Sequence, residues 1–415
     1  MISVFTPIHK YTPKILNETY QSLTKQTFKD FEWVILLNGD ALNYKEEFEK
    51  LNEDWIKIFT TSVTNNIGKL KSICCNVSKG DILVELDYDD FLTENTLQKI
   101  NDAFLNEEIN FVYSNTIRFN DSDGKSATPY RKDCGWKFRY HNGYIETIAF
   151  PALPQYLRRI EWAPDHVRSF RKKAYIDMGG YDETIEVGDD HDLICRFFIK
   201  YGEKGFHKID EPLYYYRVYE GNTSRASNRL NEIQKQVDIN YINHSEKMYL
   251  KWAKDNGLLC LDLGGRFNSN SSYVSVDLQD ADLIFDLEKP WPLQENSVGV
   301  LRAYHLLEHL NDTIHFFNEA NRVLVPGGFL LIEVPSVSGE GAFSDPTHVK
   351  FFNKRSFDYY TTEKLAKYIR PKYSGKFQKM RVVEYWWDKD VSVISANLVN
   401  LKGWYDKEWC GIREI

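Results

Sequence analysis

Acidic residues follow one apolar stretch of the chain at close spacing. The hydrophobic run 81–86 (DILVEL) leads directly into Asp87, Asp89 and Asp90. If that run is a strand of a parallel sheet, the three carboxylates lie at its carboxyl end, where such sheets bind ligands. A hard divalent cation, Mg²⁺ or Mn²⁺, would relieve their mutual repulsion because it prefers oxygen ligands. The alternative is that Asp90 or Thr93 caps the next helix, and the spacing alone leaves both open.

A second acidic group precedes the apolar run 193–201, whose spacing predicts a helix. The group is GDDHD, residues 188–192, and it contains Asp190. One of its carboxylates could take a proton from an attacking hydroxyl group. Helix capping is again the alternative. His191 alternates with carboxylates, which favours a structural histidine over a catalytic base.

The elements that must position these residues alternate between strand and helix. Apolar runs predict strands, and segments with helical periodicity lie between them, so a mostly parallel sheet is expected. The expected strands are 3–6, 31–37, 55–60 and 81–86, and the expected helices begin at Pro13 and extend over 68–77 and 91–104. The run 31–37 (FEWVILL) is apolar nearly throughout, as a strand buried on both faces should be.

A second series of the same kind opens at Leu258. Its expected strands are 258–263, 273–276, 298–303 and 328–334, with an amphipathic helix over 314–323. The alternating stretch 376–402 could complete this sheet with antiparallel strands. The polar segment between the two series has helical periodicity. We therefore expect an α/β protein with domains at 1–225 and 257–415 and a helical linker at 226–256.

Composition limits the kind of partner. The 415 residues carry a net charge of −8, so broad attraction to nucleic acid or to an anionic membrane is not expected. The basic cluster within 158–173 is either a solvated face or a site for an anionic donor or acceptor. The six cysteines form no regular framework, no long apolar leader opens the chain and no run of 18 apolar residues occurs, so we expect a cytoplasmic protein without a membrane span.

Five segments, in this order, resemble the inverting GT-A fold glycosyltransferases of the large family that includes cellulose, chitin and hyaluronan synthases. They are ISVFTPIHK, SLTKQTF leading to FEWVILLNGD, NNIGKLKSICCNVSKGDILVELDYDD, DMGGYD with GDDHDLICR, and EPLYYYRVYEGNTSR. The resemblance covers the predicted first domain. It implies a GT-A (Rossmann-like nucleotide-binding) domain that transfers a sugar from a nucleoside-diphosphate donor to a glycan or other hydroxyl acceptor with inversion, using Mn²⁺ or Mg²⁺.

The same resemblance implies roles for individual residues. Asp89 would be the chief metal ligand, Asp87 would lie near the metal and the donor ribose, and Asp190 would be the catalytic base. The positions that would contact the nucleotide or its phosphates are Thr6, Pro7, His9, Asn38, Lys69 or Lys71, Arg196 and Arg217.

Two positions depart from the family pattern. Asn38 stands where a carboxylate commonly reads uracil, so a UDP-sugar is the favoured donor while CDP, GDP and dTDP donors are less excluded. Tyr219 stands where the family has a late histidine, so one metal or phosphate contact is missing or is supplied differently. The loops within 119–157 are expected on the acceptor side, and Trp136 or Tyr140 could stack on a sugar ring.

Residues 257–360 resemble class I S-adenosylmethionine-dependent methyltransferases. The matching elements are LCLDLGG, Asp277, DLE at 286–288, HLLEH at 305–309 and RVLVPGG at 322–328. The resemblance implies a Rossmann fold that binds S-adenosylmethionine through Asp262, Gly264, Gly265, Asp277 and Asp286. Arg266 replaces a family glycine and could crowd the methionine moiety. His305, His309 and His348 are read as structural, and the loop 345–348 (DPTH) has no assigned role.

Three functions remain open on this sequence. The first is a metal-dependent glycosyltransferase, either alone or bifunctional with S-adenosylmethionine-dependent methylation of the product. The second is a methyltransferase with a degenerate, binding-only glycosyltransferase-like domain. The third is a scaffold, against which the retained Asp87, Asp89 and Asp190 argue. The sugar, the acceptor and the oligomeric state are not predicted, and the aromatic residues of the tail (Trp404, Tyr405 and Trp409) are expected to cover a core or a partner surface.

Overall fold

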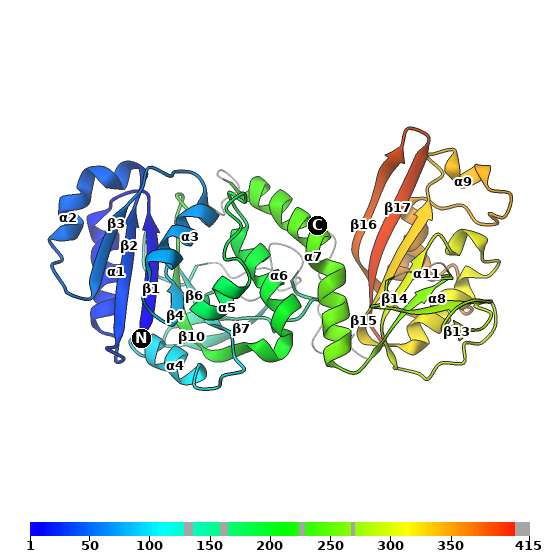
Figure 1. The fold of residues 1–415 in the computed structure, drawn as a ribbon, viewed down its shortest axis with the longest axis horizontal. Coiled ribbons are helices and arrows are strands. Elements are labelled where there is room, and N and C mark those ends of the chain that lie inside the picture. The colour runs from blue at the N-terminus through cyan, green and yellow to red at the C-terminus, as the bar shows by residue number, and fades with distance from the viewer. Residues whose placement is uncertain (128–135, 158–164, 224–228, 267–269, 403–415) are drawn as a thin grey trace. The chain divides into compact units, whose positions relative to one another are not determined.

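The computed structural model describes residues 1–127, 136–157, 165–223, 229–266 and 270–402. It divides into two compact units, with described residues up to 248 in the first and those from 249 onward in the second. Figure 1 shows each unit as a sheet with helices packed against it. The predicted limits 1–225, 226–256 and 257–415 stay predictions, because the division falls inside one long helix, α7 (Leu230–Asp255). The tail aromatics Trp404, Tyr405 and Trp409 lie outside the described residues.

Ten strands form the sheet in the described part of the first unit, and most neighbours in its first half are parallel. The strands are β1 (Ile2–Ile8), β2 (Phe31–Leu37), β3 (Ile56–Thr60), β4 (Ile82–Glu85), β5 (Phe91–Leu92), β6 (Phe111–Asn120), β7 (Lys137–His141), β8 (Tyr144–Ile148), β9 (Ser169–Arg171) and β10 (Phe206–Val218). Their order is β3-β2-β1-β4-β9-β6-β10-β5, and β7 and β8 form a hairpin beside β6. Every residue of β2 is buried, as its apolar run predicts.

The helices of the first unit begin close to where the sequence predicts them. They are α1 (Pro13–Thr24), α2 (Lys45–Glu49), α3 (Ile67–Val77), α4 (Thr96–Ala103), α5 (Lys172–Asp177), α6 (Asp189–Tyr201) and the first part of α7. Pro13 occupies the first turn of α1, where its missing N–H costs nothing. Asn66 caps α3, because its side chain accepts a hydrogen bond from the backbone N–H of Lys69.

The helix expected over 91–104 is wrong at its start. Phe91 and Leu92 form β5, which pairs with Tyr214 and Tyr215 of β10, and α4 begins only at Thr96. The Phe91 ring stacks on the Tyr215 ring with 4.7 Å between centroids. Packing against a strand more than a hundred residues away therefore overrides the local helical pattern.

Seven strands form the sheet in the described part of the second unit, in the order β13-β12-β11-β14-β15-β17-β16. They are β11 (Leu259–Leu263), β12 (Val274–Asp277), β13 (Leu283–Ile284), β14 (Val298–Tyr304), β15 (Leu324–Pro335), β16 (Phe377–Asp388) and β17 (Val391–Asn400). The first five are parallel, and β17 and β16 complete the sheet in antiparallel pairing. The prediction of antiparallel strands within 376–402 is thus confirmed.

Short helices flank the second sheet. They are α8 (Thr313–Val323), α9 (Gly341–Ser344), α10 (Asp358–Thr361), α11 (Glu363–Ala366) and a 3₁₀ turn, η4 (Leu307–His309). The second core contains the buried faces of β11, β14, β15 and α8, and Trp291 packs edge-on against Phe316 within it. None of the described helices combines the length and the apolar character that crossing a membrane requires.

Candidate active site

A buried ion network underlies the carboxyl end of β4. Lys71 of α3 lies with its Nζ 2.9 Å from Glu85 Oε1 and 3.1 Å from Asp189 Oδ2. The hydroxyl of Tyr181 donates to the second oxygen of Glu85 at 3.0 Å. All four side chains are buried, so the three charged ones are stabilised by one another and by Tyr181 and not by water. The network ties the last residue of β4 to the first residue of α6.

Arg168 extends this network to the predicted catalytic base. Its Nη2 donates to Glu85 Oε1 at 2.8 Å, and its Nη1 lies 3.1 Å from Asp190 Oδ2. The other oxygen of Asp190 accepts a hydrogen bond from the backbone N–H of His191 at 2.8 Å. Gly188 occupies the N-cap of α6 and Asp190 lies in the first turn, so Asp190 is not the cap of this helix.

The charges of this centre are strongly perturbed. Burial alone would raise the pKa of Glu85, but the neighbouring Arg168 and Lys71 hold it below its usual range. For Asp87, burial and the charge of Glu85 outweigh the effects of Lys71 and Arg168, and its pKa is raised to about 7. Burial likewise raises the pKa of Asp189 to about 6. Perturbed carboxyl groups gathered at a strand end are typical of functional sites.

Asp87, Asp90 and His166 form a group that fits a metal ion. One ligand atom from each lies within 4.8 Å of the others. Within the described part of the chain, Asp90 Oδ2 is buried without a hydrogen-bond partner, and burial raises the pKa of this carboxyl well above its usual range. Burial also lowers the pKa of His166, which keeps the imidazole neutral, as a metal ligand must be. A bound cation would offset the cost of the buried, unpaired carboxyl oxygen.

Asp89, expected as the chief metal ligand, is not one of these three residues. Its backbone carbonyl accepts a hydrogen bond from Arg217 Nε at 2.6 Å, and its carboxylate is hydrogen-bonded to the Tyr219 hydroxyl. The residue that replaces the family's late histidine thus contacts the acidic cluster directly. A histidine does lie in the acidic cluster, but it is His166, which precedes β9. This residue was not predicted from the sequence.

Arg217 is engaged within the protein. Its backbone N–H donates to Asp90 Oδ1 at 2.7 Å, and its guanidinium contacts Asp121 at 2.6 Å and also Glu18. The side chain is buried, so these carboxylates balance its charge. Arg217 therefore holds Asp89 and Asp90 in place through hydrogen bonds. Its predicted contact with phosphate stays a prediction.

The positions expected around the nucleotide lie at the ends of β1 and β2. Thr6 is buried and its hydroxyl accepts a hydrogen bond from Trp33 Nε1 at 2.9 Å. Asn38 donates to the Ile8 carbonyl at 3.0 Å, and its Oδ1 lies 3.1 Å from His9 Nδ1. These contacts orient the end of β1. Pro7, which is half-buried, lies between these residues.

Lys69 and Lys71 differ in surroundings. Lys71 is bound by two buried carboxylates, which hold its pKa above the usual range against the effect of burial. Lys69 is half-buried, and its Nζ lies 3.7 Å from Glu183 Oε2. Lys69 is therefore the one of the pair that has freedom to face a diphosphate.

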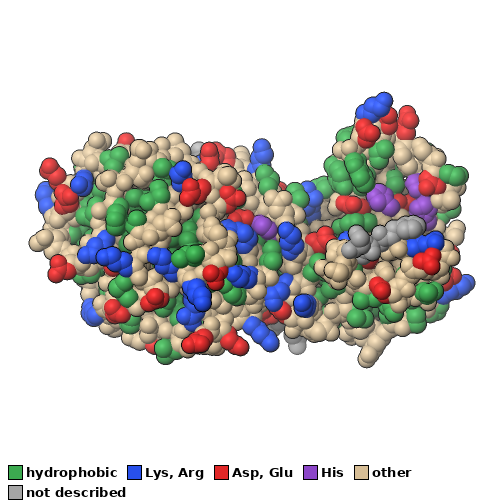
Figure 2. Space-filling view, viewed as in Figure 1, with side chains coloured by type: hydrophobic (Ala, Val, Ile, Leu, Met, Phe, Trp, Pro, Cys, Tyr) green, Lys and Arg blue, Asp and Glu red, His purple; other side chains and the backbone are tan. Residues whose placement is uncertain are grey.

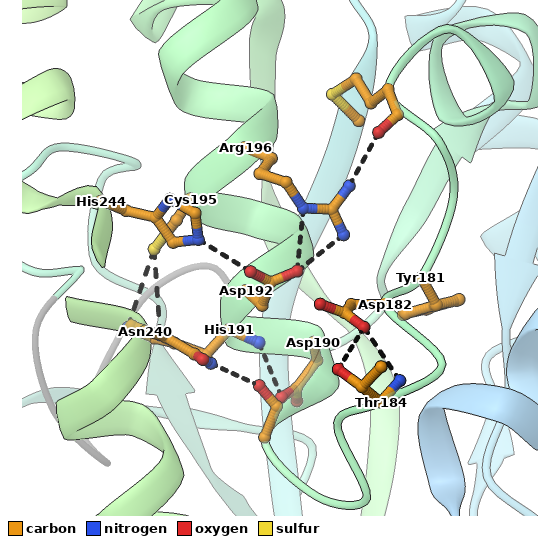
Figure 3. Close-up of polar contacts among 12 residues, drawn as sticks. Tyr181, Asp182, Thr184, Asp190, His191, Asp192, Cys195, Arg196, Asn240 and His244 are labelled. Carbon is orange, nitrogen blue, oxygen red and sulfur yellow. Dashed lines mark hydrogen bonds and ion pairs between the residues drawn. The ribbon is translucent and has the colours of Figure 1, made fainter. Parts of the chain in front are cut away.

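Arg196 belongs to a separate network on α6, which Figure 3 shows. Its Nε and Nη2 donate to Asp192 Oδ2 at 2.8 and 2.7 Å, and Nη1 donates to the Met178 carbonyl. His244 of α7 contacts the other oxygen of Asp192 at 2.7 Å. Burial lowers the pKa of His191 to about 4, so this histidine is neutral, which agrees with a structural role. In Figure 3, Asp190 points away from the Arg196 network.

The two aromatics expected to meet a sugar ring differ in exposure. Trp136 is buried, and its ring packs 4.5 Å from that of Phe150. Tyr140, on the β7–β8 hairpin, is 84% exposed. Of the two, only Tyr140 presents its ring to solvent.

The glycine turn of the second unit is tightly built. Gly264 has a φ of +74°, which disfavours other residues. A Cβ on Gly265 would lie 2.7 Å from the Asp262 carbonyl, so only glycine fits without a shift. Asp262 pairs with Arg302 through both oxygens, at 2.8 and 2.7 Å.

Asp277 and Arg266 meet beside this turn. Asp277 Oδ2 accepts a hydrogen bond from the Arg266 backbone N–H at 3.3 Å. The Arg266 guanidinium lies 2.6 Å from Asp280 Oδ2. Asp286 accepts a hydrogen bond from the backbone N–H of Glu288 at 2.9 Å, in the loop between β13 and β14. The Arg266 side chain, which was expected to crowd the methionine moiety, is thus paired with Asp280. Residues 267–269, which follow it, lie outside the described part of the chain.

A cavity of about 550 Å³ lies beside the turn η4 in the same unit. Its lining includes Glu308, His309 and His348, and none of these had been assigned a functional role from the sequence. Figure 2 shows histidine side chains gathered on the visible face of this unit. In the sequence, these residues are marked only by the adjacent pair Glu308 and His309 and by His348 in the proline-containing loop 345–348.

Residues 3–171 match the family model "Glycosyl transferase family 2", and residues 256–332 match "Methyltransferase domain". The O-antigen biosynthesis protein RfbC of Myxococcus xanthus is 25% identical over 236 residues, which are 55% of this chain and 16% of that protein. The O-antigen biosynthesis glycosyltransferase WbnJ of Escherichia coli is 23% identical over 233 residues, which are 55% of this chain and 83% of WbnJ. This chain therefore spans less than a fifth of the length of RfbC.

Among solved structures, TarS 1-349 of S. aureus in complex with UDP-GlcNAc aligns with a TM-score of 0.44 and 15% identity, over 65% of this chain and 76% of that one. The two family models agree with the sheet topologies of the two units. They confirm the predicted α/β class with a GT-A domain followed by a class I methyltransferase-like domain.

Proposed function

Because the chain carries a family 2 glycosyl transferase domain followed by a methyltransferase domain, we propose that its first unit transfers a sugar from a nucleoside-diphosphate donor to an acceptor hydroxyl, with inversion. The observation that carries the proposal is the contact of Arg168 with both Glu85 and Asp190. It joins a candidate base on α6 to the acidic end of β4. A base beside a leaving-group site is what a single displacement requires.

Divalent metal dependence follows from the charge of this centre. Carboxyl groups outnumber cations here. Glu85, Asp87, Asp189 and Asp190 lie around Lys71 and Arg168. Asp89 and Asp90 lie beside Arg217, whose charge is already paired with Glu18 and Asp121. We propose that Asp87 and Asp89 hold Mn²⁺ or Mg²⁺, with Asp90 and His166 as further candidate ligands. Such a cation supplies positive charge against the diphosphate leaving group.

Asp190 performs the proton transfer in this proposal. Its carboxylate accepts the proton of the acceptor hydroxyl as that oxygen bonds to the anomeric carbon. The bond from that carbon to the diphosphate oxygen breaks on the opposite side, so the configuration inverts. Arg168 and the His191 N–H keep the Asp190 carboxylate oriented throughout.

The donor and the acceptor are proposed from the surroundings of the site. Asn38 places an amide, which can both donate and accept hydrogen bonds, at the end of β2, and this supports a UDP donor. Lys69 is proposed to face the diphosphate. Two relatives are named for O-antigen biosynthesis, which supports a glycan hydroxyl as the acceptor. The exposed Tyr140 is a candidate platform for that glycan.

The test is release of nucleoside diphosphate from a panel of UDP-, GDP-, CDP- and dTDP-sugars with Mn²⁺ or with EDTA. We expect release from one donor with Mn²⁺ and background release with EDTA. Equal release with EDTA would refute metal dependence. No release from any donor, with and without pooled glycan acceptors, would favour a binding-only first unit and a methyltransferase as the whole activity.

A second function, methylation by the second unit, is favoured by the glycine turn. Gly264 and Gly265 leave room where a Cβ would collide, and Asp277 stands at the end of β12, where an acidic residue binds a ribose. S-adenosylmethionine would be held by Gly264, Gly265, Asp277 and Asp286 and would supply the methyl group. Calorimetric titration with this cofactor tests the proposal, and no binding at millimolar concentration would refute it.

A further inference from the structure

The second unit contains a cluster of side chains that neither proposed reaction uses. Glu308 and His309 belong to the turn η4, and His348 belongs to the loop after α9. One ligand atom from each lies within 4.8 Å of the others. We propose that these three residues bind a divalent transition-metal ion, with zinc the best match. The site is separate from the acidic cluster of the first unit and does not depend on glycosyl transfer.

Glu308 gives the strongest reason for a cation. Its side chain is buried, with 1% exposure, and neither carboxylate oxygen has a hydrogen-bond partner among the residues that the structure describes. His305 Nδ1 lies 3.6 Å from Glu308 Oε1, an ion-pair distance beyond ordinary hydrogen-bond reach. A buried carboxylate with only this distant partner is costly, and a coordinated metal ion offsets that cost.

Both histidines are held in the tautomer that a metal ion needs. His348 Nδ1 lies 2.9 Å from the Ala342 carbonyl, which can only accept, so Nδ1 carries the proton and Nε2 keeps a free lone pair. His309 Nδ1 lies 3.0 Å from Thr347 Oγ1, whose own proton goes to Asp345 at 2.6 Å. His309 therefore donates through Nδ1 and also keeps Nε2 for a metal. Such outer contacts are typical of metal-binding histidines.

The backbone fixes the distance between the two halves of the site. The N–H groups of Val349 and Lys350 both donate to the Glu308 carbonyl, at 2.8 and 3.0 Å. This pair of bonds fastens the loop that carries His348 to the turn that carries Glu308 and His309. The previously unassigned DPTH loop at 345–348 thus supplies one ligand, His348, and the residue that orients another, Thr347.

The ligand set indicates the kind of ion. Two imidazole nitrogens and one carboxylate match zinc sites that keep a further position open, whereas Mg²⁺ and Ca²⁺ prefer oxygen throughout. Zinc–ligand bonds of about 2.0–2.2 Å allow ligand atoms to lie at most about 4.4 Å apart, so small side-chain rotations would complete the site. All three residues line the cavity of about 550 Å³, so the open position faces it and can take an oxygen of a small hydroxyl- or carboxylate-bearing molecule.

Cobalt titration of the untagged, chelator-treated full chain tests the proposal, because Co²⁺ bound by imidazole gives a visible absorption band. We expect one equivalent of Co²⁺ to bind at this site, in addition to any bound by the first-unit carboxylates, with an absorption band that Zn²⁺ competes away. His309→Gln and His348→Gln should lose it. The double variant Asp87→Asn/Asp90→Asn, in the first unit, should retain it. Thr347→Val, which removes only the hydroxyl that orients His309, should weaken Co²⁺ binding by about 10- to 100-fold.

Two results would overturn the site. One is an unchanged band in both histidine variants, and the other is its loss in the first-unit double variant alone. If the histidine variants do not fold, as judged by circular dichroism, crystals of the unmutated protein soaked in Zn²⁺ decide. An anomalous peak between Glu308, His309 and His348 supports the proposal, and a map without a peak there refutes it.

Discussion

Asp190 Oδ2 lies 3.1 Å from Nη1 of Arg168, and the same arginine donates to Glu85 at the end of β4. Through Arg168, the end of β4 is joined to the start of α6, which lies about a hundred residues later in the chain. This arrangement places the candidate base and the acidic cluster within one buried set of charges. The predictions below test the parts of that set separately.

Replacement of single carboxylates identifies the metal ligands of the first unit. Asp87→Asn and Asp90→Asn should each weaken Mn²⁺ binding by at least about tenfold, because each removes a charged ligand of nearly unchanged shape. Asp89→Asn should do the same, because Asp89 is proposed to hold the metal together with Asp87. Calorimetric titration with Mn²⁺ measures this. Asp81→Asn is the matched control, since that side chain is 91% exposed at the other end of β4.

The pH dependence of metal binding follows from Asp87. Burial and the charge of Glu85 raise its pKa to about 7 in the folded protein, above its ordinary value of about 3.9. The carboxyl therefore keeps its proton between about pH 4 and 7 in the metal-free fold, and its contribution to stability is lost as pH rises through 7. Mn²⁺ competes with that proton, so affinity should rise between pH 6 and 8. In Asp87→Asn this rise should be smaller, and an equal rise would contradict the assignment.

Glu85 should be a principal stabilising residue of the buried network. Glu85→Gln leaves Lys71 and Arg168 without their shared carboxylate, which should cost about 3–5 kcal/mol in the free energy of unfolding. Urea denaturation at pH 7 measures the loss. Since the pKa of Glu85 is held below its usual range, its contribution is present above about pH 4.3 and disappears as pH falls further. A loss below 1 kcal/mol would mean that the network contributes little.

Cofactor binding by the second unit should depend on Asp277. Asp277→Asn should weaken S-adenosylmethionine binding by about tenfold or more, because a charged hydrogen-bond acceptor for the ribose is lost. Asp282→Asn serves as the control, since that exposed carboxylate only accepts from Ser275. Equal effects of the two changes in calorimetry would remove Asp277 from the cofactor site.

Much of the fold is encoded in local patterns. The apolar run of β2 and the proline at the start of α1 gave correct elements, because burial and capping act over a few residues. The interval 91–95 could not be predicted in this way, since Phe91 becomes a strand by packing on Tyr215. Pairing between distant segments leaves no local periodicity.

The candidate site divides in the same manner. Asp87 and Asp190 are marked in the sequence by clusters and family motifs. Lys71 was expected to face a diphosphate, yet it is bound by Glu85 and Asp189. His166 carries no recognisable motif, and only the fold brings it beside Asp87 and Asp90. Side-chain pairing across elements decides such roles, and the sequence alone does not reveal it.

The most direct test of the account compares the unmutated protein with Asp190→Asn at saturating donor and Mn²⁺, with the donor identified by the panel. Asparagine keeps the shape of the side chain and can still accept from the His191 N–H, but it cannot take a proton. We predict that transfer falls by at least about 100-fold while the dissociation constant of the donor changes little. Transfer within a few-fold of the unmutated rate would contradict the assignment of Asp190 as the base.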